Sequence, residues 1–201
     1  MSVPGNIFDT LVTDRTESDI DRLLYLASLW VIDEETGAAV WAGTEAELAE
    51  WNGPLKGAYT PGDINRVSNA MTIISAELTS AGYVTDYERI KLPRTFTVTI
   101  TEPDGTTSEI EYIDGRDTYS WYRDDIPNEE RMAQYRSNVA ALRGALTVYA
   151  STPPVPADME GLTWQEANDI ERILADVYAQ IQIMKKTPCT CGASVCGGDY
   201  L

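Results

Sequence analysis

A four-residue pattern, Asp-Ile-x-Arg, occurs three times in this chain of 201 residues and constrains its fold more than any other feature. The copies begin at Asp19, Asp63 and Asp169, and each follows a threonine and opens an amphipathic run. These are the features of the first turns of a helix. Within each copy the acid and the base are neighbours on the helix surface, so we expect a surface pair with the isoleucine in the core. The alternative is an arginine that reaches a partner chain.

Apolar residues recur at the spacing of a buried helix face in four stretches. Three stripes are long and mostly alternate steps of three and four, whereas the one after Thr16 is shorter. Their members are Ile20, Leu23, Leu24 and Ala27; Ile64, Val67, Met71, Ile74 and Leu78; Met132, Tyr135, Val139, Leu142 and Leu146; and Ile170, Ile173, Leu174, Val177, Ile181 and Met184. We expect a bundle of three to four long amphipathic helices.

Two runs, 94–101 and 108–113, alternate β-branched or aromatic residues with polar ones around a turn signal at 102–105. This pattern predicts a β-hairpin. Two strands are marginally stable alone, so the hairpin needs the helices, a further strand near 83–91, or a neighbouring subunit. A smaller hairpin is predicted within 31–40. The expected fold class is therefore α+β, mainly α, with a β-hairpin or small antiparallel sheet inserted into the bundle.

The chain divides into five parts. They are an extended N-terminal arm (1–15), an N-terminal helical part (16–82), the β-hairpin insertion (83–118), a C-terminal helical part (119–187) and a Cys-containing tail (188–201). Pro4 and Gly5 disfavour helix in the arm, which either docks on a neighbour or frays.

Composition narrows the functional classes. The chain carries 32 acidic and 15 basic residues and a formal charge of −17, so we expect neither nucleic acid nor an anionic membrane as a partner. It contains no histidine, the commonest general base and metal ligand. No apolar run approaches the roughly 20 residues needed to cross a bilayer, and the first residues lack the features of a signal peptide. We expect no enzyme activity, no cofactor, and synthesis in a cytoplasm.

The tail contains three cysteines, Cys189, Cys191 and Cys196. A structural zinc site normally has four Cys or His ligands, so Asp199 or a symmetry-related chain would have to complete one here. The other readings are a disulfide or interchain link, and three free thiols. No metal ligand is assigned.

Two further groups of residues invite a chemical reading. The acidic pairs 124–125 and 129–130 resemble glycosidase carboxylates, but such pairs arise by chance in a chain with 32 acidic residues. The aromatic loop, Tyr119, Trp121 and Tyr122, has the side chains that stack on sugar rings, and the same rings pack under a hairpin or at a subunit contact. No catalytic residue is assigned.

Segments in order along most of the chain carry a family resemblance. They include Leu-Lys-Gly-Ala-Tyr at 55–59 and Thr-Trp-Gln-Glu-Ala-Asn-Asp-Ile-Glu-Arg at 163–172, and the others are 13–16, 19–20, 49–51, 63–66, 125–127, 138–143, 162 and 173–174. Together they resemble a family of small virion proteins encoded in the tail modules of phages and prophages of Gram-positive bacteria. The resemblance is weakest at 84–117 and in the Cys-containing tail.

This resemblance implies a non-enzymatic structural protein of the virion, in the tail, baseplate or fibre-attachment region, assembled in the bacterial host cytoplasm. The implied partners are other virion proteins and further copies of the chain in a symmetric assembly. The alternative is a glycan- or receptor-binding module that uses the aromatic loop to bind a host surface glycan.

Overall fold

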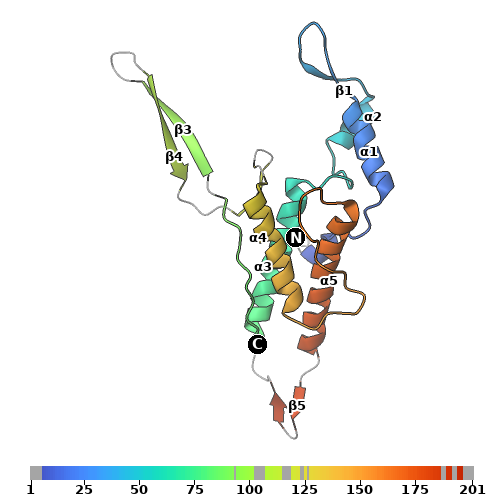
Figure 1. Cartoon of the computed structure of the whole chain (residues 1–201), viewed down its shortest axis with the longest axis vertical. Helices are drawn as coiled ribbons and strands as arrows, with labels where there is room; N and C mark the ends of the chain where they lie inside the picture. Colours follow the sequence, from blue (N-terminus) through green and yellow to red (C-terminus); the bar gives the residue numbers. More distant parts are fainter. Residues whose placement is uncertain are drawn as a thin grey trace, which may run out of the picture.

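The fold is α+β and mainly helical. Five α-helices and three two-stranded antiparallel sheets are present among the residues that the computed structural model describes, which are 6–92, 94–101, 107–114, 119–122, 125, 127–186, 189–191 and 194–196. Three long helices pack against one another, and the sheets stand at the periphery of this helical core (Figure 1).

The helical core consists of α3 (Pro61–Ser80), α4 (Glu129–Gly144) and α5 (Trp164–Lys186). Their predicted apolar stripes form its interior, since every member is buried or packed against the buried cluster except Met184, which is exposed near the end of α5. Leu92 and Trp121, from irregular segments, complete this interior. The helical period thus identified the buried faces of these three helices correctly.

Hydroxyl and carboxylate side chains begin four of the helices with the same capping box. Thr60 accepts a hydrogen bond from the N–H of Asp63, whose carboxylate accepts one from the N–H of Thr60 in return. Thr16 and Asp19 form the same box. The remaining boxes are Thr44 with Glu47 and Thr163 with Glu166. The repeated aspartate therefore closes the box in its first two copies, whereas Asp169 lies one turn further along its helix.

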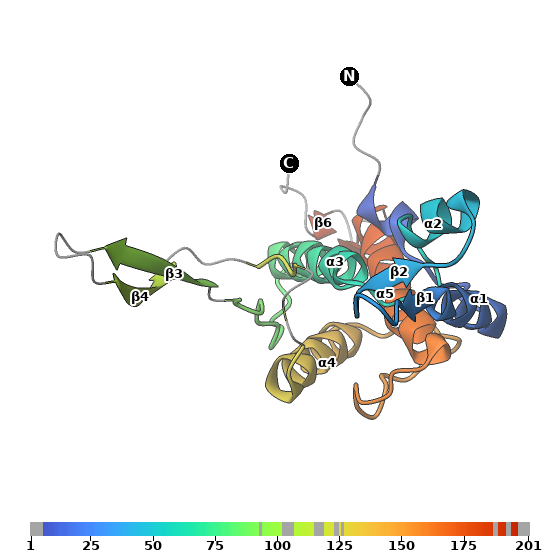
Figure 2. The same cartoon turned by 90° about the horizontal axis from the view of Figure 1, so that it is seen from above.

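Residues 16–53 form a separate unit beside the core, which we call the N-terminal lobe. It contains α1 (Glu17–Ser28), β1 (Trp30–Ile32), β2 (Ala39–Trp41) and α2 (Glu45–Trp51). The predicted small hairpin is confirmed, with Trp30 opposite Trp41 in the ladder. Figure 2 shows the lobe lying to one side of the three core helices.

The predicted apolar face of α1 is wrong. Leu24 and Ala27 are exposed, Ile20 and Leu23 are half-buried, and the fully buried side chain is Leu26. The physical reason is that α1 packs on α2 and β1 within the lobe, so no shared core selects the predicted stripe.

The insertion hairpin forms as predicted, from β3 (Arg94–Thr101) and β4 (Thr107–Asp114). Its turn, 102–105, lies outside the described residues. Of the three alternatives for its support, the further strand near 83–91 does not form, since those residues are irregular. Among the described elements, β3 and β4 contact each other extensively and no other element to a comparable degree. The hairpin projects from the core (Figures 1 and 2).

Three asparagines tie irregular segments to the helices. Each accepts a hydrogen bond from the backbone N–H of one residue and donates one to the C=O of that same residue, as a neighbouring strand would. The pairs are Asn65 with Trp121 (2.7 and 2.8 Å), Asn138 with Glu88 (3.0 and 2.7 Å), and Asn168 with Arg15 (3.0 and 2.9 Å). Two of these clamps hold the chain on either side of the insertion hairpin.

Candidate functional site

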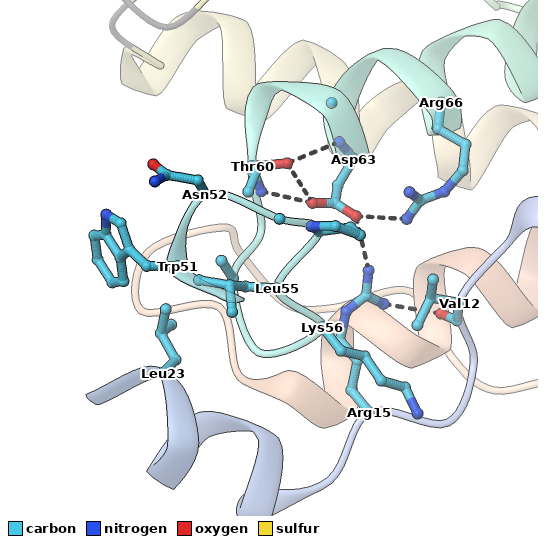
Figure 3. A pocket seen from close by; sticks show the side chains of 14 residues that line it. Val12, Arg15, Leu23, Trp51, Asn52, Leu55, Lys56, Thr60, Asp63 and Arg66 are labelled. Carbon is cyan, nitrogen blue, oxygen red and sulfur yellow. Dashed lines mark hydrogen bonds and ion pairs between the residues drawn. The ribbon is translucent and has the colours of Figure 1, made fainter. Parts of the chain in front are cut away.

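A pocket of about 720 Å³ lies between the N-terminal lobe and the start of α3 (Figure 3). Its walls combine apolar side chains with three cations and one carboxylate. The apolar members include Val12, Leu23, Trp51, Pro54 and Leu55, and the charged members are Arg15, Lys56, Asp63 and Arg66. The exposed Lys56 ammonium is paired with the carboxylate of Asp14 at 2.8 Å.

Arg15, Asp63 and Arg66 in the wall of this pocket belong to a buried network of ion pairs. The Glu171 carboxylate is completely buried and accepts hydrogen bonds from Arg15 (2.7 Å), Arg66 (2.8 Å) and the N–H of Val12 (2.7 Å). Asp63 accepts from Arg66 at 2.6 Å and from Arg15 at 3.3 Å. Two guanidinium groups thus face two carboxylates, and the network is neutral as a whole.

The repeated pattern supplies most of this network. Asp63 and Arg66 are the acid and base of the second copy, and Glu171 is the variable residue of the third. The two copies meet because α3 packs on α5. The burial of Glu171 was not predicted from the sequence. The signal for it was the position of this carboxylate directly after Ile170 and before Ile173, within an apolar stripe.

Asp63 and Arg66 both have pKa values shifted in favour of their charged forms. Burial raises the pKa of Asp63, but hydrogen bonds from Thr60 and Arg66 outweigh it and hold that pKa below its usual value. Burial lowers the pKa of Arg66, and the bonds to Glu171 and Asp63 outweigh it, so the pKa is raised. Both groups are therefore fully charged near neutral pH, and they hold neighbouring segments in position rather than exchange protons.

Two tyrosines adjoin the network. The hydroxyls of Tyr59 and Tyr135 lie 2.7 Å apart and share a hydrogen bond, and burial raises the pKa of both phenols. The guanidinium of Arg15 lies 5.4 Å from the centre of the Tyr59 ring. Its Nε is the one buried side-chain polar atom without a hydrogen-bond partner within the described ranges.

All three arginines of the repeated pattern bind within the chain. Arg22 pairs with Glu50, Arg66 with the network, and Arg172 with Asp176 at 3.1 Å. A pair between the acid and the base of one copy forms only in the second copy, where it belongs to the buried network rather than to the surface. In the other two copies an acid from another turn or another helix replaces it.

The N-terminal arm, within residues 6–15, docks on its own chain. The sequence left a choice between docking on a neighbouring chain and fraying; residues 6–15 bind within the chain, and residues 1–5 of the arm lie outside the described residues. Phe8, in the 3-10 turn η1 (Ile7–Thr10), stacks on Tyr178 with ring centres 3.6 Å apart and planes 8° apart. Arg15 and Val12 bind α5 through Glu171 and Asn168, so the arm covers one side of that helix.

The aromatic loop does not present three rings to solvent. Trp121 is only 3% exposed and lies in the core. The Tyr119 ring lies 4.0 Å from the guanidinium of Arg89. Tyr122 alone is largely exposed, so stacking on a glycan would rest on one ring.

Three of the four residues in the two acidic pairs lie within the described residues. Asp125 accepts a hydrogen bond from the N–H of Tyr122 at 2.6 Å, and Asp124 lies outside the described residues. Glu129 and Glu130 are exposed in the first turn of α4, where negative charge complements the helix dipole.

The described part of the tail forms a small ladder of β5 (Cys189–Cys191) and β6 (Ser194–Cys196). Its register places Cys189 opposite Cys196 and Cys191 opposite Ser194. Asp199 lies outside the described residues. Metal, disulfide and free thiol therefore all remain predictions for these cysteines.

Comparison with known proteins adds no relative to this picture. No family model, curated protein or solved structure matches the chain. Within the described ranges, no helix has both the length and the apolar character that crossing a bilayer requires. In the same residues, no group of three or more metal-binding side chains converges.

Proposed function

We propose that this protein is a non-enzymatic structural component of a phage virion, in the tail, baseplate or fibre-attachment region, and that it acts through protein–protein contacts in a symmetric assembly. The observation that carries the proposal is a contrast within the fold. The helical core is closed by apolar and ionic contacts, whereas the β1–β2 and β3–β4 hairpins lie at its periphery and, apart from the contact of β1 with α1, pack little outside their own ladders among the described elements.

Isolated two-stranded hairpins are marginally stable in water. The β1–β2 hairpin nevertheless exposes Trp30, Val31, Ile32 and Val40. The β3–β4 hairpin extends eight residues per strand away from the core. Both features suit a protein whose hairpins are covered by neighbours in an assembly.

The proposal includes the finer architecture. In it, α3, α4 and α5 act as the long helices of a bundle, and α1 belongs to the N-terminal lobe beside that bundle. The buried network and the asparagine clamps make this bundle a rigid base, because they tie the arm and both flanks of the insertion to it. A rigid base that carries projecting hairpins is well suited to repeated contacts between subunits.

The test is the location of the chain. Particles are induced from cells that carry the gene, purified on a density gradient and analysed by mass spectrometry and cryo-electron microscopy. We expect the chain to sediment with tail proteins at a constant copy number per particle. Complete particles without the chain would overturn the proposal.

A second measurement distinguishes a glycan-binding role from the structural role. The purified chain and its Tyr122→Ala variant are applied to immobilised cell-wall glycans. Binding by the monomer that Tyr122→Ala abolishes would favour the receptor-binding alternative, and no binding by either form would favour the structural role.

A further inference from the structure

The N-terminal lobe leaves an unusual amount of apolar surface open. Six large apolar side chains on α1, β1 and β2 are between 40% and 66% exposed: Leu24, Tyr25, Trp30, Val31, Ile32 and Val40. Only one residue of the lobe, Leu26, is buried. Clusters of this kind on a folded chain mark interaction sites.

The β1–β2 ribbon is apolar on both faces. Its register places Val31 opposite Val40 on one face, and Ile32 opposite Ala39 on the other. The second face also carries Trp30, whose ring lies 5.3 Å from that of Trp41. A ribbon that is apolar on both sides is buried better by a groove than by a flat surface.

The charge around this ribbon is strongly one-sided. Residues 16–53 contain nine acidic residues and one basic residue, a net charge of −8. The single base, Arg22, is already paired with Glu50 at 2.6 Å. The rim of the apolar surface therefore favours a cationic partner and repels an anionic one.

Hydrogen bonds stabilise the turn at the tip of the ribbon. The Asp33 carboxylate accepts hydrogen bonds from the N–H (2.8 Å) and the hydroxyl (2.7 Å) of Thr36. Gly37 has a φ of +68°, which closes the turn without strain. Glu34 and Glu35 are exposed at this tip. The hydrogen-bonded turn thus presents two exposed carboxylates at the tip of the ribbon.

From these observations we propose that the β1–β2 ribbon inserts into a groove of a different protein, whose floor is apolar and whose rim carries Lys and Arg. A second copy of this chain is a poor occupant, because the whole chain carries a formal charge of −17 and would repel the acidic lobe. The inference rests on the proposed structural function and deepens it by naming the surface and the chemistry of the partner.

The probe is a pair of synthetic two-helix peptides with the same leucine-lined groove, one edged by lysines and the other by glutamates. Each is titrated into the full-length, ¹⁵N-labelled chain. We expect the lysine-edged peptide to shift the amide resonances of Val31, Ile32 and Val40, and added salt to weaken its binding. The glutamate-edged peptide should produce no shifts.

Matched variants locate the binding. Ile32→Asp should weaken the lysine-edged peptide more than tenfold. Ile183→Asp, at a comparably exposed isoleucine on α5, should leave the affinity unchanged. Equal binding of both peptides, no binding of either, or full binding by Ile32→Asp would overturn the inference, as would a dimer of the chain that Ile32→Asp dissociates.

The two proposals fail separately. If particles contain the chain but neither peptide binds, only the proposed docking surface is overturned. If the chain binds the lysine-edged peptide specifically but is absent from particles, the proposed virion function is overturned. The docking surface for a basic protein is then still supported.

Discussion

The helical core and the N-terminal lobe use the same Asp-Ile-x-Arg pattern with different results. On α3, Asp63 and Arg66 join a buried network with Glu171. On α1, Asp19 only caps the helix, and Arg22 pairs with an acid whose side chain is 41% exposed. Exposed pairs contribute at most about 1 kcal/mol, whereas breaking a buried pair costs about 3–5 kcal/mol. The contribution of the pattern to stability thus depends on whether other segments of the chain bury it.

The third copy neither caps its helix nor joins its own acid and base in a buried network. Glu166 already closes the capping box of α5, so Asp169 lies beyond it, where burial and the nearby charge of Glu166 raise its pKa. Arg172 binds Asp176, whose other carboxylate oxygen accepts a hydrogen bond from the Thr152 hydroxyl at 2.6 Å. This copy ties the connector before α5 to the middle of that helix.

The largest expected effect is from Glu171→Gln. The substitution leaves Arg15 and Arg66 short of a buried counter-charge, so the free energy of unfolding should fall by about 3–5 kcal/mol. Urea unfolding followed by circular dichroism measures it. Glu50→Gln, which removes the exposed partner of Arg22, should cost no more than about 1 kcal/mol. Equal losses in the two variants would contradict the comparison.

Asn138→Ala should cost about 1–3 kcal/mol, because it leaves the backbone N–H and C=O of Glu88 without their partners. Amide hydrogen exchange at Glu88 should accelerate. Asn52→Ala, at an exposed position at the end of α2, serves as the matched change in the lobe and should stay within about 0.5 kcal/mol of the parent. Unchanged exchange at Glu88 would argue against the clamp.

Gly57→Ala tests the junction between the two regions. A Cβ at this position would overlap the backbone carbonyl of Asp19, so α1 must shift and the free energy of unfolding should fall by about 1–3 kcal/mol. Gly144→Ala, where no atom lies within 4 Å of the added Cβ, should instead stabilise α4 by about 0.5–1 kcal/mol. Thermal unfolding of both variants tests whether Gly57→Ala destabilises the protein and Gly144→Ala stabilises it.

The capping aspartate of the helical core, Asp63, should contribute more to stability in acid than the capping aspartate of the lobe, Asp19. Because the pKa of Asp63 is lower in the folded chain, its contribution is present above the unfolded value of 3.8 and is lost as the pH falls through the folded value. Asp63→Asn should therefore flatten the loss of stability below about pH 4. A smaller flattening is expected for Asp19→Asn, whose capping box is exposed. Superimposable pH profiles of parent and Asp63→Asn would contradict this.

The smallest effect is expected on the ribbon. Ile32→Asp removes no buried contact, so the free energy of unfolding should change by less than about 0.5 kcal/mol. Urea midpoints of this variant and Ile183→Asp measure the change. A loss of several kcal/mol would mean that Ile32 packs within the chain.

Local rules predicted much of this fold. The capping boxes opened by Thr44 and Thr163, the stripes of α3, α4 and α5, and the strands β3 and β4 follow from residues within a few positions of one another. Such patterns can be read directly, because hydrogen-bond geometry and helical or strand period act over short distances along the chain.

The same rules failed where distant segments meet. The sequence determined which residues begin helices and which faces are apolar, but α1 lost its predicted face because the lobe packs apart from the core. Only the tertiary structure placed Glu171 beside the N–H of Val12, 159 positions away, and the Asn138 amide beside Glu88, 50 positions away. A buried carboxylate or amide is stable only when its partners are supplied, and packing decides which segments supply them.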